Sequence, residues 1–233
     1  MARLPRLLVP GQLHLVMQRS AGGQPVFTTD ADFDLYLVAL RELAREHDVH
    51  LHAYALLSTQ VMLLLTPGHA LSLSRLMQAQ GRRFGAAYNR VHQRAGVLWE
   101  GRFRATVLDP QEYGLAAVQF VETAAVRARE CLVASDYRWS SAPHHAGKQS
   151  DPLITEHAVH WQLGNTPFER EAAYRNSVHQ LQVQQLHQQM EAAVLKGWAL
   201  GSPAFIAALS DLTDRRLTAL AQGRPRGSRP KKD

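Results

Sequence analysis

Short runs dominated by apolar residues alternate with polar turns along the first half of the chain, and this pattern predicts strands. The runs are HLVMQR (14–19), VHLHAYALL (49–57), VMLLLT (61–66) and LWEGRFRATVLD (98–109). A minimal loop at Ser58–Thr59 separates the second run from the third. We therefore expect these two runs to form a β-hairpin.

Between these runs, apolar residues recur every three or four positions, which is the spacing of an amphipathic helix. One helix is predicted over 28–47 and a longer one over about 71–94. A third follows the last strand, with Asp109 as its N-cap and Pro110 at its first position. The apolar stripe of the longer helix consists of Leu73, Leu76, Met77, Phe84, Tyr88 and Val91.

The order strand, helix, two strands, helix, strand, helix predicts an α+β fold with a ferredoxin-like antiparallel sheet and packed helices. We place this first domain at 9–124. The composition changes near 144–152, after which the chain becomes Gln-rich and helical in pattern. We therefore expect an all-α C-terminal region at 148–221. The last residues, 222–233, are basic and rich in Gly and Pro, which predicts a disordered tail.

Composition narrows the class of protein. The chain has 233 residues, of which 45% are hydrophobic and 20% charged, as in globular proteins. A single cysteine, Cys131, excludes an internal disulfide framework and suits a reducing compartment. The apolar runs are too short for a membrane span, and no export signal is visible. The formal net charge of +6 favours a polyanionic partner, either nucleic acid or an acidic membrane surface.

Arginines recur on the side of the 71–94 helix that is opposite to its apolar stripe. They are Arg75, Arg82, Arg83, Arg90 and Arg94. On the last predicted strand, Arg102 and Arg104 alternate on one face beside Trp99, which could stack on an unpaired base. A solvated basic face, and a Trp99 that belongs to the core, are the competing interpretations.

The tail contains GRPRGSRPKK, which resembles a minor-groove hook with Arg224 and Arg226 as the inserted arginines. Non-specific affinity through counterion release is the alternative for such a run.

Six segments stand in a characteristic order: HLVMQR, HAYALLSTQVMLLLTP, LSRLMQAQGRRFGAAYNR, GVLWEGRFRATVLD, EYGLAAVQFVETAAVRA and YRWSSA. Together they resemble the REP-associated tyrosine transposases, which are members of the single-tyrosine HUH class. The resemblance covers about residues 2–147. In that family two histidines hold Mg²⁺ or Mn²⁺, and a tyrosine attacks a phosphate to nick and rejoin single-stranded DNA.

The same resemblance implies that the catalytic positions of this chain have changed. It places the metal histidines at Gln60 and Met62, the nucleophile at Phe120 and a helper asparagine at Ala124. Glutamine and methionine are poor ligands for Mg²⁺ or Mn²⁺, and phenylalanine has no oxygen. We therefore expect no catalytic residue, no metal and no cofactor. Of the family's Arg-Gly-Asn-Asn-Arg loop, only Arg19 remains as a candidate DNA contact.

Two substitutes for the lost chemistry are weighed. His50 and His52 form another His-x-His, but strand alternation predicts that they lie on the sheet face opposite to Met62. Tyr113 precedes Phe120 by two helical turns, about 10 Å along the axis. We therefore expect Tyr113 to be a packing residue.

The sequence thus predicts a transposase-family protein that binds single-stranded or hairpin DNA without nicking or strand transfer. We expect a cytoplasmic, nucleoid-associated protein, a homodimer as a further option, and no membrane partner. Two alternatives remain open: an active transposase with a divergent site or an active partner subunit, and an RNA-binding or assembly protein. The last is motivated by the Gln-rich stretch 179–194, where Leu181, Leu186 and Met190 are near helical spacing.

Overall fold

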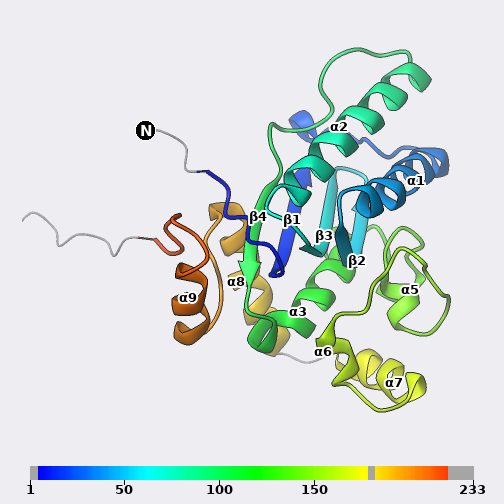
Figure 1. The fold of residues 1–233 in the computed structure, drawn as a ribbon. Coiled ribbons are helices and arrows are strands. Elements are labelled where there is room, and N and C mark those ends of the chain that lie inside the picture. The colour runs from blue at the N-terminus through cyan, green and yellow to red at the C-terminus, as the bar shows by residue number, and fades with distance from the viewer. Residues whose placement is uncertain (1–4, 178–181, 220–233) are drawn as a thin grey trace, which may run out of the picture.

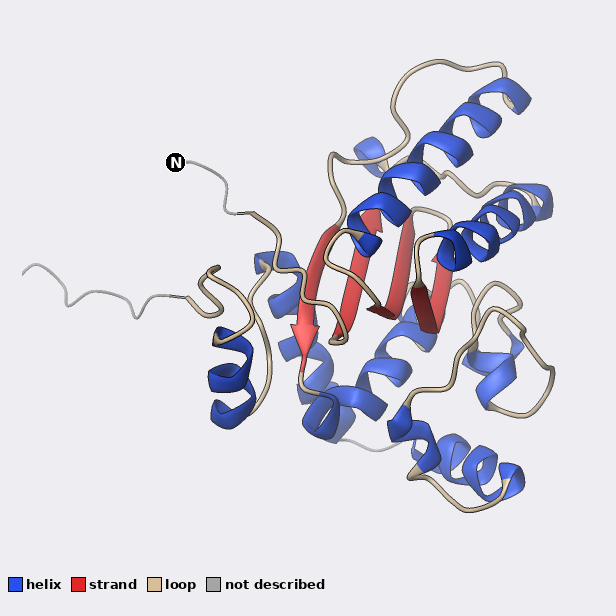
Figure 2. Ribbon diagram, in the orientation of Figure 1, coloured by secondary structure: helices blue, strands red, loops and turns tan. Residues whose placement is uncertain are grey.

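A four-stranded antiparallel sheet forms the centre of the molecule (Figures 1 and 2). The computed structural model describes residues 5–177 and 182–219. The strands are β1 (Leu13–Arg19), β2 (Val49–Leu57), β3 (Gln60–Pro67) and β4 (Arg104–Leu108). Their order across the sheet is β2-β3-β1-β4, which is that of a ferredoxin-like layer. The predicted α+β class is confirmed.

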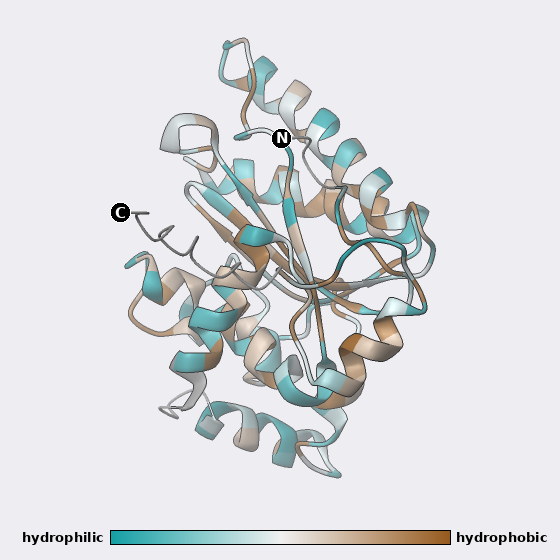
Figure 3. Ribbon diagram, turned by 90° about the vertical axis from the view of Figure 1, so that its left-hand side faces the viewer, coloured by the Kyte–Doolittle hydropathy of each residue, from teal (hydrophilic) through white to brown (hydrophobic). Residues whose placement is uncertain are grey.

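Helices α1 (Asp30–Glu46) and α2 (Ser72–Val91) cover one face of the sheet. Strand alternation explains this division, because Val61 and Leu63 of β3 join the core under these helices whereas Met62 joins the opposite core. Aromatic rings fill the α1–α2 side, among them Phe27, Phe33, Tyr36, Phe84 and Trp99. Figure 3 shows the hydrophobic residues concentrated on the strands between the helices.

Helices α3 (Pro110–Glu122), α4 (Ala124–Arg127) and α8 (Gln182–Lys196) lie against the other face. Helix α3 begins as the sequence predicted, because the Asp109 carboxylate accepts a hydrogen bond from Gln111 N at 3.0 Å. The sheet is therefore buried between two helical layers (Figure 1).

Shorter elements connect and extend these layers. They are η1 (Ala21–Gly23), η2 (Ala134–Asp136), α5 (Ala142–His145), α6 (Ala158–Trp161), α7 (Pro167–Ser177) and α9 (Pro203–Ser210). The helices predicted after the sheet are confirmed for the described residues. The expected tail at 222–233 lies outside them, and the boundaries at 9–124 and 148–221 stay predictions. No helix in the described ranges combines the length and apolar character needed to cross a bilayer.

The last strand is shorter than the sequence predicted. It begins at Arg104, because Gly101 adopts a φ of 63° and turns the chain just before it. Upstream of this turn, Trp99 makes an isolated bridge to Ser20 at the end of β1. The predicted strand at 98–109 is therefore wrong in its first half.

Candidate nucleic-acid interface

The β2–β3 hairpin and the end of α3 bring together the four positions that the resemblance singled out. Gln60 and Met62 lie on β3, where Met62 is paired with Ala55 of β2 in the predicted hairpin. Phe120 lies in the last turn of α3, and Ala124 begins α4. All four positions line one pocket of about 300 Å³, which we call the Phe120 pocket.

The two positions that the resemblance gives to metal ligands, Gln60 and Met62, do not suit Mg²⁺ or Mn²⁺. Met62 offers a buried thioether, a soft ligand that suits neither Mg²⁺ nor Mn²⁺. The Oε1 of Gln60 accepts a hydrogen bond from Arg19 Nε at 3.2 Å. The guanidinium of Arg127 lies 4.4 Å from the centre of the Phe120 ring, and it would repel a metal ion held nearby. Gln60, Met62 and Phe120 therefore supply neither a pair of imidazoles nor a hydroxyl at this pocket, although Glu191 adds a carboxylate to its lining.

The same pocket suits an anion. Arg127 is held by hydrogen bonds to Phe120 O and Thr123 Oγ1, both 2.6 Å. Desolvation lowers the pKa of Arg127 to about 10, against the opposite effect of Glu191, so the guanidinium stays charged at pH 7. Arg19 approaches the same carboxylate, with its Nη2 4.0 Å from Glu191 Oε1. Guanidinium groups match the geometry of phosphate oxygens.

Sequence reasoning missed both Arg127 and Glu191. Arg127 follows Phe120 by seven residues, which places both on one face of a helical segment, so spacing offered a signal. Glu191 offered none, because it reaches the pocket through the packing of α8 against the sheet.

The arginines predicted on the outer side of α2 are all exposed. They are Arg75, Arg82, Arg83, Arg90 and Arg94. Arg83 forms an ion pair with Glu42 of α1, at 2.5 Å between Nη1 and Oε2, so its charge is partly neutralised. Val91 was predicted in the apolar stripe, but its side chain is 63% exposed where α2 ends.

The end of β1, the start of β3 and the loop after α2 meet at one end of the sheet (Figure 1). Backbone hydrogen bonds of 2.8 Å join them, from Glu100 N to Arg19 O and from Ser20 N to Thr59 O. Helix α2 runs toward this end, with Arg90 in its last turn. The basic end of α2 and the Phe120 pocket therefore lie at the same end of the sheet.

Trp99 belongs to the core rather than to a DNA-facing surface. Its side chain is 8% exposed, and its ring lies 6.0 Å from Phe84 and 6.3 Å from Tyr36. Stacking on a base would require Trp99 to leave these neighbours, so the core interpretation replaces the base-stacking one. Arg102 and Arg104 are exposed on either side of the buried Phe103, as predicted, but Arg102 precedes β4 and only Arg104 lies on the strand.

Arg102 and Arg104 do share a second pocket, of about 310 Å³, which we call the basic pocket. Its basic lining residues are Arg6, Arg102, Arg104, Lys196 and Arg215, and none of the described lining residues is acidic. Main-chain carbonyls hold three of the guanidiniums, since Arg104 donates to Leu195 O at 2.9 Å, Arg215 to Pro5 O at 2.6 Å and Arg6 to Phe103 O at 3.0 Å. Carbonyls do not neutralise charge, so this pocket also suits an anion.

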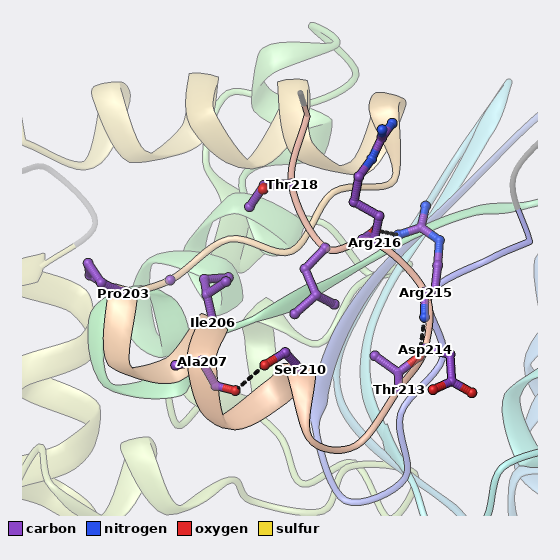
Figure 4. Close-up of a pocket in the computed structure, with 11 residues that line it drawn as sticks. Pro203, Ile206, Ala207, Ser210, Thr213, Asp214, Arg215, Arg216 and Thr218 are labelled. Atoms are coloured by element: carbon purple, nitrogen blue, oxygen red, sulfur yellow. Dashed lines mark hydrogen bonds between the residues drawn. The ribbon is translucent and has the colours of Figure 1, made fainter. Parts of the chain in front are cut away.

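Arg215 also lines a neighbouring pocket of about 730 Å³, formed by α9 and residues 213–218 (Figure 4). There its Nη1 donates to Arg216 O at 3.2 Å. Apolar residues such as Ile206 contribute to this pocket. Its described lining residues include one acidic side chain, Asp214, and no histidine.

A β-bulge changes the expected position of His52. The register shifts between Leu51 and Ala53, and His52 Nε2 is 2.8 Å from Thr66 Oγ1, on the Met62 face of β3. The prediction that His50 and His52 face the other side of the sheet is therefore wrong for both, since His50 is paired with Thr66. His52 nevertheless lies beside Thr66, four residues beyond Met62 on β3, and its Nδ1 is 2.7 Å from the main-chain carbonyl of Thr155. It does not join the Phe120 pocket.

Tyr113 packs in the core of the α3 side, and its hydroxyl donates to Gln189 Oε1 at 2.8 Å. Leu186 and Met190 of the Gln-rich stretch pack in the same core, so the sheet domain itself covers this apolar face of α8. Three residues considered above lie outside the described part of the chain: Leu181, Arg224 and Arg226.

Comparison with known proteins gives a match at the level of the fold. No family model and no curated protein matches the sequence. Among solved structures, a REP-associated tyrosine transposase bound to a REP hairpin superposes with a TM-score of 0.53 and 14% identity, covering 68% of this chain and 93% of that one. The two proteins share a fold. A candidate transposase from Deinococcus radiodurans R1 gives a TM-score of 0.36 and 18% identity, over 56% of this chain and 89% of that one.

Proposed function

We propose that the protein binds DNA in single-stranded or hairpin form and does not nick it. The Phe120 pocket carries the proposal, because Arg127 lines it together with Met62 and Phe120, and Arg19 borders it through its hydrogen bond to Gln60. These arginines suit a phosphate of the backbone. The fold shared with a transposase bound to a REP hairpin supports DNA as the ligand class.

Helix α8 links the two anion-binding pockets. Glu191 lines the Phe120 pocket, and Lys196 lines the basic pocket. Five residues separate them, which is about 7.5 Å along a helix axis. One nucleic-acid strand can therefore place neighbouring phosphates at both pockets, while the exposed arginines of α2 add sequence-independent affinity.

Glu191 is the natural competitor of a phosphate at the Phe120 pocket. Its carboxylate is near both guanidiniums, so a bound phosphate must replace or repel it. Removing this charge with Glu191→Gln is therefore expected to strengthen binding. Removing the cation with Arg127→Gln has the opposite effect.

The test measures binding of end-labelled hairpin DNA to wild type and three variants on native gels. Arg127→Gln should raise Kd about 10-fold, the value of a lost charge-assisted hydrogen bond. Glu191→Gln should lower Kd. Arg45→Gln is the matched control, because Arg45 is exposed at the end of α1, on the opposite sheet face, and it should leave Kd within about twofold. Circular dichroism verifies that each variant is folded.

A parallel denaturing gel, with Mg²⁺ or Mn²⁺ present, tests for cleavage. We expect intact strands. A cut strand attached covalently to the protein would contradict the proposal and favour the active transposase. Equal effects of Arg127→Gln and Arg45→Gln on Kd would show that the Phe120 pocket does not bind the DNA. A strong preference for structured RNA over hairpin DNA would favour an RNA-binding role.

A further inference from the structure

A cluster of histidine and carboxylate side chains lies beside α3, apart from both anion-binding pockets. His144 and His145 end α5, and Glu156 precedes α6. The potential ligand atoms of these three residues lie within 4.8 Å of one another. We propose that this cluster binds one zinc ion.

The spacing of the donors is that of ligands around a shared metal. The Oε2 of Glu156 is 3.4 Å from His145 Nε2 and 3.6 Å from His160 Nδ1. Two ligands at about 2.0–2.1 Å from a tetrahedral zinc lie about 3.3–3.4 Å from each other. This oxygen is buried and lacks a hydrogen-bond partner among the described residues. A metal at this point would satisfy it.

A second carboxylate orients one of the imidazoles. The Nδ1 of His145 is 2.6 Å from Glu122 Oε1, which turns its Nε2 toward Glu156. Hydroxyls of Ser141 and Tyr174 donate to the same Glu122 carboxylate. Metal-binding histidines are commonly held in this way, by a carboxylate on the nitrogen that faces away from the metal.

The charge and donor types select the metal. The buried carboxylate of Glu122 and the partly exposed carboxylate of Glu156 flank His145, and the hydroxyls that bind Glu122 bring no positive charge. A divalent cation offsets them. Imidazole with carboxylate is a donor set for zinc, whereas Mg²⁺ prefers oxygen ligands alone. This site is therefore different in position and in chemistry from the metal site that the family resemblance implies.

Metal binding by His144 requires the loss of one of its hydrogen bonds. Its Nδ1 accepts a hydrogen bond from Asp151 N at 3.1 Å, so the ring proton stays on Nε2, which is 2.9 Å from Glu156 Oε1. Coordination through Nε2 costs this backbone hydrogen bond. His160, whose Nδ1 is 3.6 Å from Glu156 Oε2, lies beside these three ligands, which leave the fourth position of a tetrahedral zinc open. Such a site ties α5 and α6 to α3 through Glu122.

The experiment titrates zinc chloride into tag-free protein that has been stripped of metal, and follows the heat of binding. Wild type should bind one Zn²⁺ per chain with a Kd below about 1 µM. Glu156→Gln should weaken binding at least about 100-fold. Glu156→Gln is preferred to His145→Gln as the test, because the glutamine at position 156 can still accept the hydrogen bond from His144 and so preserves the local structure.

Asp48→Asn is the matched control. Asp48 is exposed and lies 3.2 Å from His69 Nε2 and 3.9 Å from His50 Nε2, so it tests adventitious binding by surface histidines. Zinc should raise the Tm of wild type and of Asp48→Asn, and leave that of Glu156→Gln unchanged. Absence of a 1:1 site tighter than about 10 µM, tight binding by Glu156→Gln, or loss of binding in Asp48→Asn would each overturn the proposal.

Discussion

At the position that the family resemblance gives to a nucleophile, Phe120 offers an aromatic ring and no oxygen. Arg127 covers that ring at 4.4 Å, and Arg19 holds Gln60 at 3.2 Å. The anion preference that we propose for this pocket therefore rests on single residues presented by one strand and one helix. Chemistry at the residue scale is separable from the fold that presents it.

His14 makes the stability of the protein depend on pH. It is fully buried, its Nδ1 lies 2.7 Å from Gln12 O, and its Nε2 accepts from Val9 N at 3.2 Å, which requires the neutral ring. Burial lowers its pKa to about 4 from a usual value near 6.5. The unfolded chain therefore binds more protons between these values, and stability is lost as pH falls through that window.

We expect His14→Gln to remove about 2 kcal/mol of the difference in the free energy of unfolding between pH 7.5 and pH 5. Urea denaturation at both pH values measures it. His69→Gln, at a side chain that is 80% exposed, serves as control and should leave the pH dependence unchanged. An unchanged pH dependence in His14→Gln would contradict the neutral, buried ring.

At the scale of elements, Asp109 connects two helices that are distant in sequence. Its carboxylate caps α3 through Gln111 N and also accepts a hydrogen bond from Ser202 Oγ at 2.9 Å. Ser202 in turn caps α9 through Phe205 N at 3.1 Å. The cap of α3 follows from local sequence, whereas its link to α9 exists only in the folded molecule.

Asp109→Ala is expected to lower the free energy of unfolding by about 2–3 kcal/mol, the sum of a lost cap and a lost charge-assisted hydrogen bond. A double-mutant cycle with Ser202→Ala should show a coupling above about 0.5 kcal/mol, because the two side chains are in contact. Denaturant unfolding gives all four values. Additive effects would show that the two helices do not share this residue energetically.

At the scale of the whole molecule, positive charge is distributed over both helical layers. The Phe120 pocket lies on the α3 side, and the arginines of α2 project from the other side, but both reach the same end of the sheet. A ligand that spans this end can contact both sets. The α2 arginines should therefore supply affinity that depends on salt and little on sequence.

Arg90→Ala should reduce the slope of log K against log salt for hairpin DNA by about 0.7–0.9, the value of one phosphate contact. Filter binding across a series of salt concentrations measures this slope. Arg45→Ala removes one positive charge from the end of α1 and should leave the slope unchanged. Equal slopes for the two variants would show that the end of α2 does not touch DNA.

Local pattern determined much of this protein. Short apolar runs predicted β1, β2 and β3, helical spacing predicted α1 and α2, and Asp109 with Pro110 predicted the start of α3. These features depend on residues that are neighbours in the chain, so they can be predicted from the sequence. The family resemblance, which rests on ordered motifs, also predicted that Gln60, Met62 and Phe120 lie close together, and all three line one pocket.

Only the tertiary structure decided the rest. A positive φ at Gly101 delayed β4, and a bulge beside His52 reversed the face expected for that residue, because one inserted residue shifts a two-residue period. Glu191 reaches its pocket from a helix about 70 residues further along the chain than Phe120, and the cluster around Glu156 assembles from three separate segments. Such contacts depend on how helices pack on the sheet, and no local pattern encodes that packing.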